Sequence, residues 1–303
     1  MPLKWYNRFG ILFWSEFLFM DLIPEYKCMA ISDKSVYENL VNKFESHLSC
    51  YTFANFIMWQ EPNQWRFFKY NDHLVCFSGK DDNITFFEPI GNKPWKIMID
   101  LLKTFPTAKF QRICENTALK LEEQIKLKID LDNSEYLYNS SDLKFLEGRK
   151  YDGKRNHIKK IKEIGYDYER ITHENIAECQ DFMNKWIAGK VSQEDFAKED
   201  EAVKKAFEHF NDLNLCGGII KINGKIVAFT FGEIYKDALV VHVEKGDSTY
   251  NGVYQVINYE FCNDFGKDLP FINRQQDLGI KGIRKAKESY HPIKLIKTYK
   301  SCK

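Results

Sequence analysis

The sequence lacks closely spaced cysteines, although it contains eight cysteines in 303 residues. A structural zinc site needs cysteine or histidine ligands at short, regular intervals, so we expect no metal site. A chain of this length can bury a large core without covalent cross-links. Cys76 and Cys216 lie in apolar, strand-like stretches. We therefore predict free thiols in a reducing cytoplasm.

The chain also lacks a large net charge and a long apolar run. Its 44 Lys and Arg residues against 43 Asp and Glu residues give +1, so any polyanion binding must come from a local basic patch. The apolar stretch from Gly10 to Ile23 is too short to span a bilayer, is interrupted by Glu16 and Asp21, and precedes no small-residue cleavage site. We expect residues 1–30 to be an extension packed on the body or upstream of a start at Met20, with no transmembrane segment.

Aromatic residues are plentiful, at 15% of the chain, and they predict a large, ring-rich core. The length suits two domains. In the first, apolar spacing predicts helices over 32–46 and 51–59, then an antiparallel meander of three strands. A helix, a strand and a further helix follow. The predicted ranges of the meander and the later elements are 65–70, 74–78, 84–89, 93–105, 110–114 and 118–126.

A similar order of elements returns in the second half of the chain. A polar connector over 132–145 contains a short strand at 136–138, and helices are expected at 176–186 and 195–210. Asn223-Gly224 between two apolar runs predicts a two-residue hairpin. A further strand and a helix over 254–265 follow. We infer a tandem duplication of one α+β (α/β) domain, over residues 31–132 and 133–303, each with a mixed, mostly antiparallel sheet flanked by helices.

Polar side chains are concentrated in the segment HVEKG, residues 242–246, where a strand is expected to end. Alternation along a strand would place His242 and Glu244 on one face, where either could take a proton from an attacking amine. A half-solvated sheet face is the alternative. The loop after Gly246 enters a helix whose first turns contain Gln255 and Asn258. Free amides at such a helix start suit a phosphate or a carboxylate.

A second polar group follows near the C-terminus. Asn273, Arg274 and Asp277 lie where a strand is expected to end. Arg284 and Lys287 are three residues apart, so on a helix they share a face and could hold a phosphate or a carboxylate. The alternatives are a solvated basic face and a purely structural pair between Asp277 and Arg284.

The most basic run of the chain lies at 149–162, with seven Lys and Arg residues against one Asp. Lys154, Arg155 and His157 are its candidate polyanion-binding residues, since an imidazole among cations suits stacking on a nucleic-acid end. A solvated helix face is the alternative.

Four separated motifs resemble one known family. They are YTFANFIMW, KFLEGRKYDGKRNHIKKI, HVEKGDSTYNGVYQVIN and INRQQDLGIKGIRKAKESYHP. Together they resemble the phosphatidylglycerol lysyltransferase C-terminal domain, and in particular its soluble bacterial branch. The resemblance implies two N-acetyltransferase-like domains in tandem, with the active site in the second. By position, it implies that Asp277, Arg284, Lys287 and Tyr290 line the substrate site.

The resemblance implies an acyltransferase or aminoacyltransferase that takes an amino acid from aminoacyl-tRNA, or an acyl group from acyl-CoA. The acceptor would be an amine or hydroxyl of a small molecule, peptide or lipid headgroup. In this hypothesis Glu244 or His242 is the base, and backbone amides near a split between the strands over 226–233 and 239–244 stabilise the oxyanion.

Two alternatives remain open. One is an acetyl-CoA-dependent N-acetyltransferase of a small amine, although the loop DSTYNG has one glycine and no arginine to cradle a pyrophosphate. The other is a non-catalytic module that binds tRNA or another polyanion.

Overall fold

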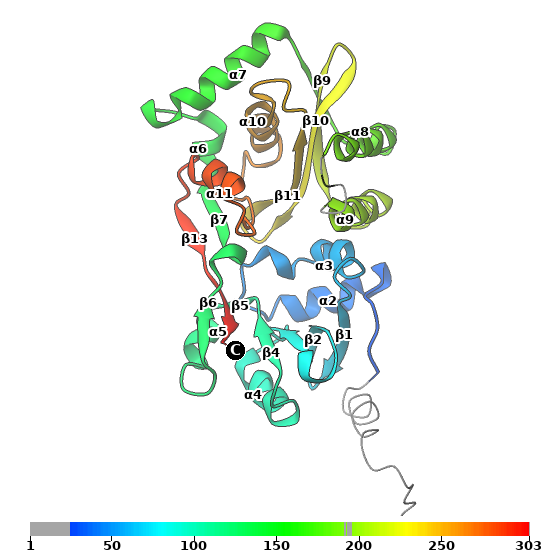
Figure 1. Cartoon of the computed structure of the whole chain (residues 1–303), viewed down its shortest axis with the longest axis vertical. Coiled ribbons are helices and arrows are strands. Elements are labelled where there is room, and N and C mark those ends of the chain that lie inside the picture. The colour runs from blue at the N-terminus through cyan, green and yellow to red at the C-terminus, as the bar shows by residue number, and fades with distance from the viewer. Residues whose placement is uncertain (1–24, 191, 193–195, 303) are drawn as a thin grey trace, which may run out of the picture.

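The computed structural model describes residues 25–190, 192 and 196–302. The apolar stretch over 10–23, and with it most of the predicted N-terminal extension, lies outside the described residues. Two sheet-and-helix halves follow one another along the long axis of the molecule (Figure 1). The predicted α+β class is confirmed, since each half combines a mostly antiparallel sheet with flanking helices.

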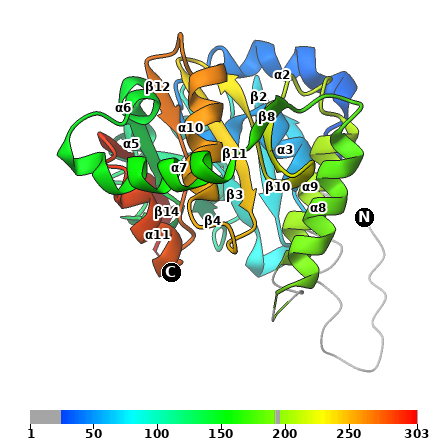
Figure 2. The same cartoon turned by 90° about the horizontal axis from the view of Figure 1, so that it is seen from above.

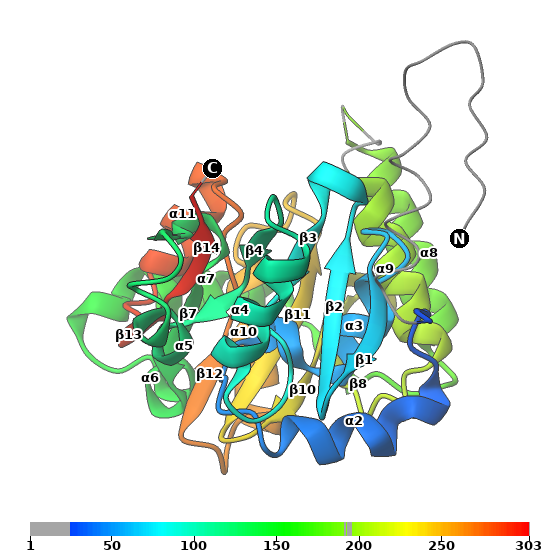
Figure 3. The same cartoon turned by 90° about the horizontal axis from the view of Figure 1, so that it is seen from below.

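The first half contains the predicted meander. Its four-stranded sheet has the order β1-β2-β3-β4, and only β4 runs parallel to its neighbour, β3 (Figure 3). The predicted strand over 110–114 is instead two strands, because Arg112 interrupts it with a φ of 59°. The last predicted helix begins earlier and ends at Lys120. The elements are α2 (Lys34–Val41), α3 (Phe53–Trp59), β1 (Arg66–Tyr70), β2 (His73–Ser78), β3 (Thr85–Phe87), α4 (Pro94–Thr104), β4 (Lys109–Gln111), β5 (Ile113–Cys114), α5 (Glu115–Lys120) and β6 (Leu127–Ile129).

The second half is built on a seven-stranded sheet with the order β13-β7-β12-β11-β10-β9-β8. Helices α8 and α9 cover one face, and α10 and α7 cover the other (Figure 2). The elements are β7 (Glu135–Asn139), α6 (Ser140–Phe145), α7 (Asp152–Ile164), β8 (Asp167–Arg170), α8 (Ile176–Ala188), α9 (Ala197–Glu208), β9 (Cys216–Ile222), β10 (Lys225–Tyr235), β11 (Ala238–Gly246), α10 (Val253–Phe265), β12 (Phe271–Asn273), α11 (Lys281–Glu288), β13 (Lys294–Ile296) and β14 (Thr298–Ser301).

The Asn-Gly hairpin prediction is confirmed. Asn223 and Gly224 have φ values of 51° and 72°, and Ile222 pairs with Lys225 across the turn. Both central residues need positive φ in a type I′ turn, which asparagine and glycine tolerate best. The turn aligns β9 and β10 so that Ile219, Phe229 and Phe231 reach one core cluster.

Two irregularities shape the middle of the second sheet. In the β10–β11 pair, Phe231 faces Val243 and Gly232 faces Val241, so His242 is the extra residue of a β-bulge. In the parallel β11–β12 pair, pairing ends at Val240 and Asn273, although β11 continues to Gly246. The sheet is therefore parted between β11 and β12 beyond these two residues.

The two halves share a core and a strand. Phe56 of α3 belongs to the same buried cluster as Phe207 of α9 and Phe229 of β10. The last strand of the chain, β14, pairs with β5 and β6, so the chain ends inside the first half (Figure 1). The division at residue 132 remains a proposal about domain organisation.

Candidate functional site

Three stretches that are distant in the sequence meet beside the parted strands. The Arg274 cluster consists of Glu244 of β11, Asn258 of α10, Arg274 after β12, and Lys287 and Tyr290 at the end of α11. Arg274 Nη2 lies 3.0 Å from Glu244 Oε1, and Asn258 Nδ2 lies 3.4 Å from Glu244 Oε2. The Arg274 guanidinium stacks 4.8 Å from the centre of the Tyr290 ring. These residues were predicted from separate motifs, and the structure brings them together.

Arg274 has hydrogen-bonding capacity left over. Its side chain is only 11% exposed, yet its Nη1 atom is buried and has no partner among the described residues. Burial alone would lower the pKa of Arg274, but Glu244 outweighs it and raises that pKa. A buried, charged donor without an acceptor is costly, so an anionic or carbonyl group of a ligand would be stabilised here.

Lysines border this cluster. Lys287 Nζ donates to the carbonyl oxygen of Arg274 at 2.5 Å and to that of Gln276. Burial, aided by the Arg274 charge, lowers the pKa of Lys287 to about 7. Lys154 of α7 lies 4.0 Å from the centre of the Tyr290 ring and donates to Ser289 Oγ at 2.6 Å. Burial and the same arginine lower the pKa of Lys154 to about 8.

Asp277 and Arg284 form a separate, closed network. Asp277 is fully buried and accepts from Arg284 Nε at 2.8 Å, from the Tyr136 hydroxyl at 2.6 Å and from the Gly279 amide at 2.8 Å. Arg284 also contacts Asp132 at 2.9 Å. The structural pair left open by the sequence is therefore present, and it anchors α11 to the body. These two residues do not join the Arg274 cluster.

His242 and Glu244 do not share a face, contrary to the alternation argument. The bulge at His242 reverses the alternation, so Glu244 faces α10 while His242 faces the first half of the chain. His242 Nε2 lies 2.7 Å from Glu233 Oε1, and its Nδ1 lies 3.0 Å from Gln275 Nε2. The His242 side chain is 1% exposed.

The His242 network continues into the first half. Gln275 Nε2 lies 3.1 Å from Ser49 Oγ, and that hydroxyl donates to Glu135 Oε1 at 2.8 Å. Asn273 Nδ2 donates to the same carboxylate at 2.7 Å. Asn273 therefore belongs to this network and not to the Arg274 cluster.

The opening proposed between β10 and β11 is not there, because these strands pair over almost their whole length. The strands that part are β11 and β12. His242 and Gln275 lie just beyond the last paired residues, Val240 and Asn273, and hydrogen-bond to each other across the gap. This bridge separates the Arg274 cluster from the space between the two halves.

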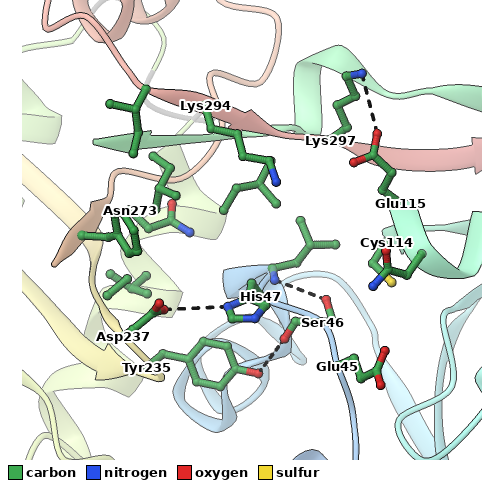
Figure 4. A pocket seen from close by; sticks show the side chains of 18 residues that line it. Glu45, Ser46, His47, Cys114, Glu115, Tyr235, Asp237, Asn273, Lys294 and Lys297 are labelled. Atoms are coloured by element: carbon green, nitrogen blue, oxygen red, sulfur yellow. Dashed lines mark hydrogen bonds and ion pairs between the residues drawn. The ribbon is translucent and has the colours of Figure 1, made fainter. Parts of the chain in front are cut away.

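A cavity of about 400 Å³ lies on the inter-half side of that bridge (Figure 4). Leu48, Val240 and Asn273 line it. Leu48 precedes Ser49 in the chain, and Val240 and Asn273 lie two residues before His242 and Gln275. Its walls are largely apolar, with charged groups around them. The other lining residues are Glu45, Ser46, His47, Cys114, Glu115, Asn116, Leu137, Tyr235, Asp237, Ala238, Phe271, Ile293, Lys294, Ile296 and Lys297.

Among the described residues that line the cavity, Lys294 is a cation without a carboxylate partner. His47 lies 3.8 Å from Asp237, and Lys297 lies 3.7 Å from Glu115. The Lys294 ammonium points into the hollow (Figure 4). This mixture of apolar wall and polar rim is typical of a small-molecule site.

The loop before α10 is not an open anion cradle. A Cβ atom at Gly252 would collide with the carbonyl oxygen of His157, so α7 covers the start of α10. This close packing of α7 leaves little room for the predicted phosphate at this helix start. Gln255 lies on the same side of α10 as Asn258 and is half-buried.

The basic run forms α7, but its predicted binding residues are largely engaged. Arg155 donates to the carbonyl oxygens of Leu146 and Gly148 and pairs with Asp152. Lys154 faces Tyr290, and His157 is half-buried against α10. The exposed lysines of α7 are further along the helix, at Lys159, Lys160 and Lys162.

Sequence reasoning missed the partners that join the halves: Ser49, Glu135, Glu233 and Gln275. The sequence signal for this network was Glu135, a carboxylate at the start of the aromatic strand EYLY. In the structure this carboxylate is fully buried. Its acceptors are satisfied only by groups that the chain brings from 86 and 138 residues away. The spacing of apolar residues along the chain gives no information about partners this distant.

Within the described part of the chain, all eight cysteines are free thiols and no group of acidic, histidine or cysteine side chains could hold a metal ion. Among the same residues, no helix is both long and apolar enough to cross a membrane.

Comparisons with known proteins agree with this architecture. The family described as "Phosphatidylglycerol lysyltransferase, C-terminal" matches residues 41–302. A crystal structure of a conserved protein of unknown function from Bacteroides thetaiotaomicron VPI-5482 is 33% identical, with a TM-score of 0.84, and the alignment covers 92% of this chain and 99% of that one. L-PGS from Bacillus licheniformis is 14% identical, with a TM-score of 0.63, over 89% of this chain and 91% of that one.

A curated relative, the uncharacterized protein MYCGA3080 of Mycoplasmoides gallisepticum, is 24% identical over 191 residues. The match covers 60% of this chain and 62% of the relative's length. The mixed, mostly antiparallel α+β architecture implied by the resemblance is confirmed.

Proposed function

The chain belongs to the phosphatidylglycerol lysyltransferase C-terminal domain family, and from this premise we propose that it moves an aminoacyl group from aminoacyl-tRNA to an amine or hydroxyl acceptor. Transfer of an acyl or aminoacyl group is the kind of reaction that the family supports. The identities of the donor and of the acceptor are our proposal.

The unpaired Nη1 atom of Arg274 is the observation that supports the proposal most. It is buried beside Glu244, where β11 and β12 part. An aminoacyl ester has a carbonyl oxygen that can accept from this guanidinium and an ammonium group that can pair with the carboxylate. The Arg274–Glu244 pair thus offers complementary groups to both ends of an amino acid.

The acceptor in this proposal enters from the other side of the sheet. The inter-half cavity ends at Val240 and Asn273, immediately before the His242–Gln275 bridge. A nucleophile in the cavity would reach the donor carbonyl once Gln275 releases the imidazole. His242, backed by Glu233 at 2.7 Å, is then the group placed to take a proton.

The reaction balances with these groups. The acceptor nitrogen or oxygen attacks the ester carbonyl carbon, and its proton passes to His242. The bond between that carbon and the tRNA ribose oxygen breaks, and the leaving oxygen takes the proton back from His242. Glu233 stabilises the imidazolium in between, as a carboxylate does in other histidine-based sites. Arg274 Nη1 donates to the oxyanion as its charge develops.

In this proposal the tRNA body contacts α7. Lys159, Lys160 and Lys162 are exposed, and α7 adjoins the Arg274 cluster through Lys154. Such a contact would neutralise phosphates without reading a sequence, so donor binding should weaken as salt rises. The covered start of α10 and the sparse loop DSTYNG argue against an acyl-CoA donor.

The experiment is a comparison of donors. The protein is incubated with radiolabelled aminoacyl-tRNA or labelled acetyl-CoA, together with a panel of amines, peptides and phospholipid vesicles. We expect label to leave tRNA and appear on an acceptor, and we expect Arg274→Met to slow this about 100-fold or more. The matched variant Arg66→Met, on β1 of the first half, should behave as wild type. Consumption of acetyl-CoA alone, or of neither donor, would refute the aminoacyl proposal.

A further inference from the structure

A second cavity, of about 680 Å³, lies in the first half of the chain. Helix α2 lies beside β2 (Figure 3), and the cavity opens between that helix, the turn from β1 to β2 and the segment after β3. It shares no lining residue with the inter-half cavity, so the proposed transfer does not account for it. We call it the α2 cavity, and its lining residues are Val36, Asn39, Leu40, Lys43, Lys69, Asn71, Asp72, His73 and Asn92.

The lining of the α2 cavity is mainly polar. Of its nine residues, seven have amide, carboxylate, ammonium or imidazole groups, and the other two are Val36 and Leu40. A lipid chain or an apolar peptide segment would cover these polar groups without giving them partners, which costs free energy. The volume suits a small molecule. The lining therefore favours a small polar ligand.

The lysines of the α2 cavity are not neutralised by the described part of the chain. Within that part, neither Lys43 nor Lys69 forms an ion pair or a side-chain hydrogen bond. The Asp33 carboxylate interacts electrostatically with Lys69, but it is already paired with Lys27 at 2.7 Å. The lining itself has two ammonium groups and the carboxylate of Asp72. This excess of positive charge favours an anionic ligand.

His73 contributes a buried polar atom that lacks a partner. The residue is 9% exposed, and its Nε2 lies 2.8 Å from the carbonyl oxygen of Asn92. A carbonyl oxygen can only accept, so Nε2 has the hydrogen of this bond. The other ring nitrogen, Nδ1, is buried and has no partner among the described residues. Such an atom is costly, so a polar ligand or a water that it holds would be stabilised beside the ring.

The backbone around this imidazole fixes its position. A Cβ atom at Gly91 would lie 2.5 Å from His73 Cδ2, so the ring occupies space that a side chain would otherwise fill. Leu74 and Ile90 exchange backbone hydrogen bonds of 3.0 and 2.9 Å, which hold the segment after β3 against the start of β2. The ring is therefore positioned before any ligand arrives, which lowers the entropic cost of binding.

We infer that the α2 cavity binds a small hydroxylated anion of the sugar-phosphate type. The phosphate contacts Lys43 and Lys69, and the sugar hydroxyls donate to Asp72 and bond to the amides of Asn39 and Asn71. The side chains of these last three residues have no hydrogen bond within the described part of the chain. A bare phosphate would leave them unused. The inference is independent of the proposed function, because all of these groups lie within residues 36–92.

Titration calorimetry of the whole chain tests the inference. The probes are ribose 5-phosphate, glucose 6-phosphate, ribose, inorganic phosphate and a short RNA oligonucleotide. At least one sugar phosphate should bind at a single site, about tenfold or more tighter than inorganic phosphate, and ribose should give no binding heat. The double variant Lys43→Gln, Lys69→Gln should lose about tenfold or more in affinity. His73→Phe keeps a ring without its nitrogens and should lose about fivefold.

Matched variants control for general effects. The double variant Lys80→Gln, Lys96→Gln removes two exposed lysines of the first half that do not line the α2 cavity. It should bind the sugar phosphate as wild type does. Arg274→Met should also bind it normally, because the Arg274 cluster lies in the second half. Since Lys43 and Lys69 are exposed, their double variant should keep the wild-type melting temperature.

Four results would overturn the inference. The first is wild-type protein that binds neither sugar phosphate, and the second is inorganic phosphate that binds as tightly as the sugar phosphates. The third is binding that persists in the Lys43→Gln, Lys69→Gln variant or disappears in Arg274→Met, which would place the ligand elsewhere. The fourth is binding of the RNA through Lys43 and Lys69 without binding of a sugar phosphate.

Discussion

Two charged side chains, Asp277 and Lys287, give the clearest predictions about stability and its dependence on pH. Burial would raise the pKa of Asp277, but its bonds from Arg284, Tyr136 and Gly279 outweigh burial and lower that pKa to about 2. Its unfolded value is about 3.9, so the carboxylate stabilises the fold above about pH 4 and loses this effect as pH falls through about 2. We expect Asp277→Asn to lower the free energy of unfolding by about 2–4 kcal/mol at neutral pH.

Urea unfolding at neutral pH and near pH 3 measures this effect for Asp277→Asn. The difference from wild type should shrink near pH 3, because Asp277 of the unfolded chain is then mostly protonated, while in the fold it stays mostly ionised until about pH 2. Asp167→Asn, at an exposed position of β8, should leave the unfolding midpoint unchanged. A deficit of the same size at both pH values would show that Asp277 acts through packing and not through its charge.

Lys287 gives a pH dependence of the same sign at higher pH. Its pKa in the fold is about 7, against about 10.4 in an unfolded chain, so the unfolded state holds more protons between these values. The wild-type free energy of unfolding should therefore rise, relative to Lys287→Met, as pH increases from about 7 to about 10. The exposed neighbour Lys285→Met supplies the control. A constant difference across this range would mean that the ammonium is not penalised in the fold.

The same lysine combines a place in the candidate site with contacts that support the fold. With only a substrate role, Lys287→Ala would weaken donor binding and leave the melting temperature nearly unchanged. The structure gives Lys287 two backbone partners on the segment after β12, so we expect its removal to lower stability as well.

Among strands and helices, the sequence predicted what depends on near neighbours. The Asn223-Gly224 turn, the meander of β1 to β3 and helices such as α3 and α10 follow from local chemistry and spacing. The motifs of the Arg274 cluster were also identified in advance. These features could be predicted from the sequence because each is determined by residues close together in the chain.

The bulge at His242 was not predictable in this way. A strand of alternating side chains implies that His242 and Glu244 share a face, and only the pairing with β10 shows the extra residue that separates them. The same holds for the parting of β11 and β12, which depends on where a distant strand stops. The proposed division of roles between His242 and Glu244 follows from these two irregularities.

The bulge also yields a prediction about His242. Because its side chain is 1% exposed and pairs with Glu233, His242→Ala leaves a carboxylate that is only 12% exposed without its partner and should cost about 1–3 kcal/mol of stability. His242→Gln keeps a hydrogen-bonding group and should preserve more of the fold, but it cannot carry a proton. Thermal unfolding of both variants checks this, and equal melting temperatures would contradict it.

For the complete chain, the shared core predicts cooperative unfolding. Residues of α3 pack in one cluster with residues of α9 and β10, Glu135 joins Ser49 to Asn273, and β14 pairs inside the first half. Calorimetry should therefore show one transition for both halves, with equal calorimetric and van't Hoff enthalpies. Two separated transitions would show that the halves fold independently despite these contacts.

The account rests on a site with two sides, in which Arg274 holds the donor and His242 serves the acceptor. The most direct measurement compares Arg274→Met with His242→Gln for binding of aminoacyl-tRNA and for transfer in a single turnover. We predict that Arg274→Met loses both, whereas His242→Gln binds the donor as wild type does and transfers about 100-fold more slowly. Unchanged transfer in His242→Gln, or unchanged donor binding in Arg274→Met, would contradict the account.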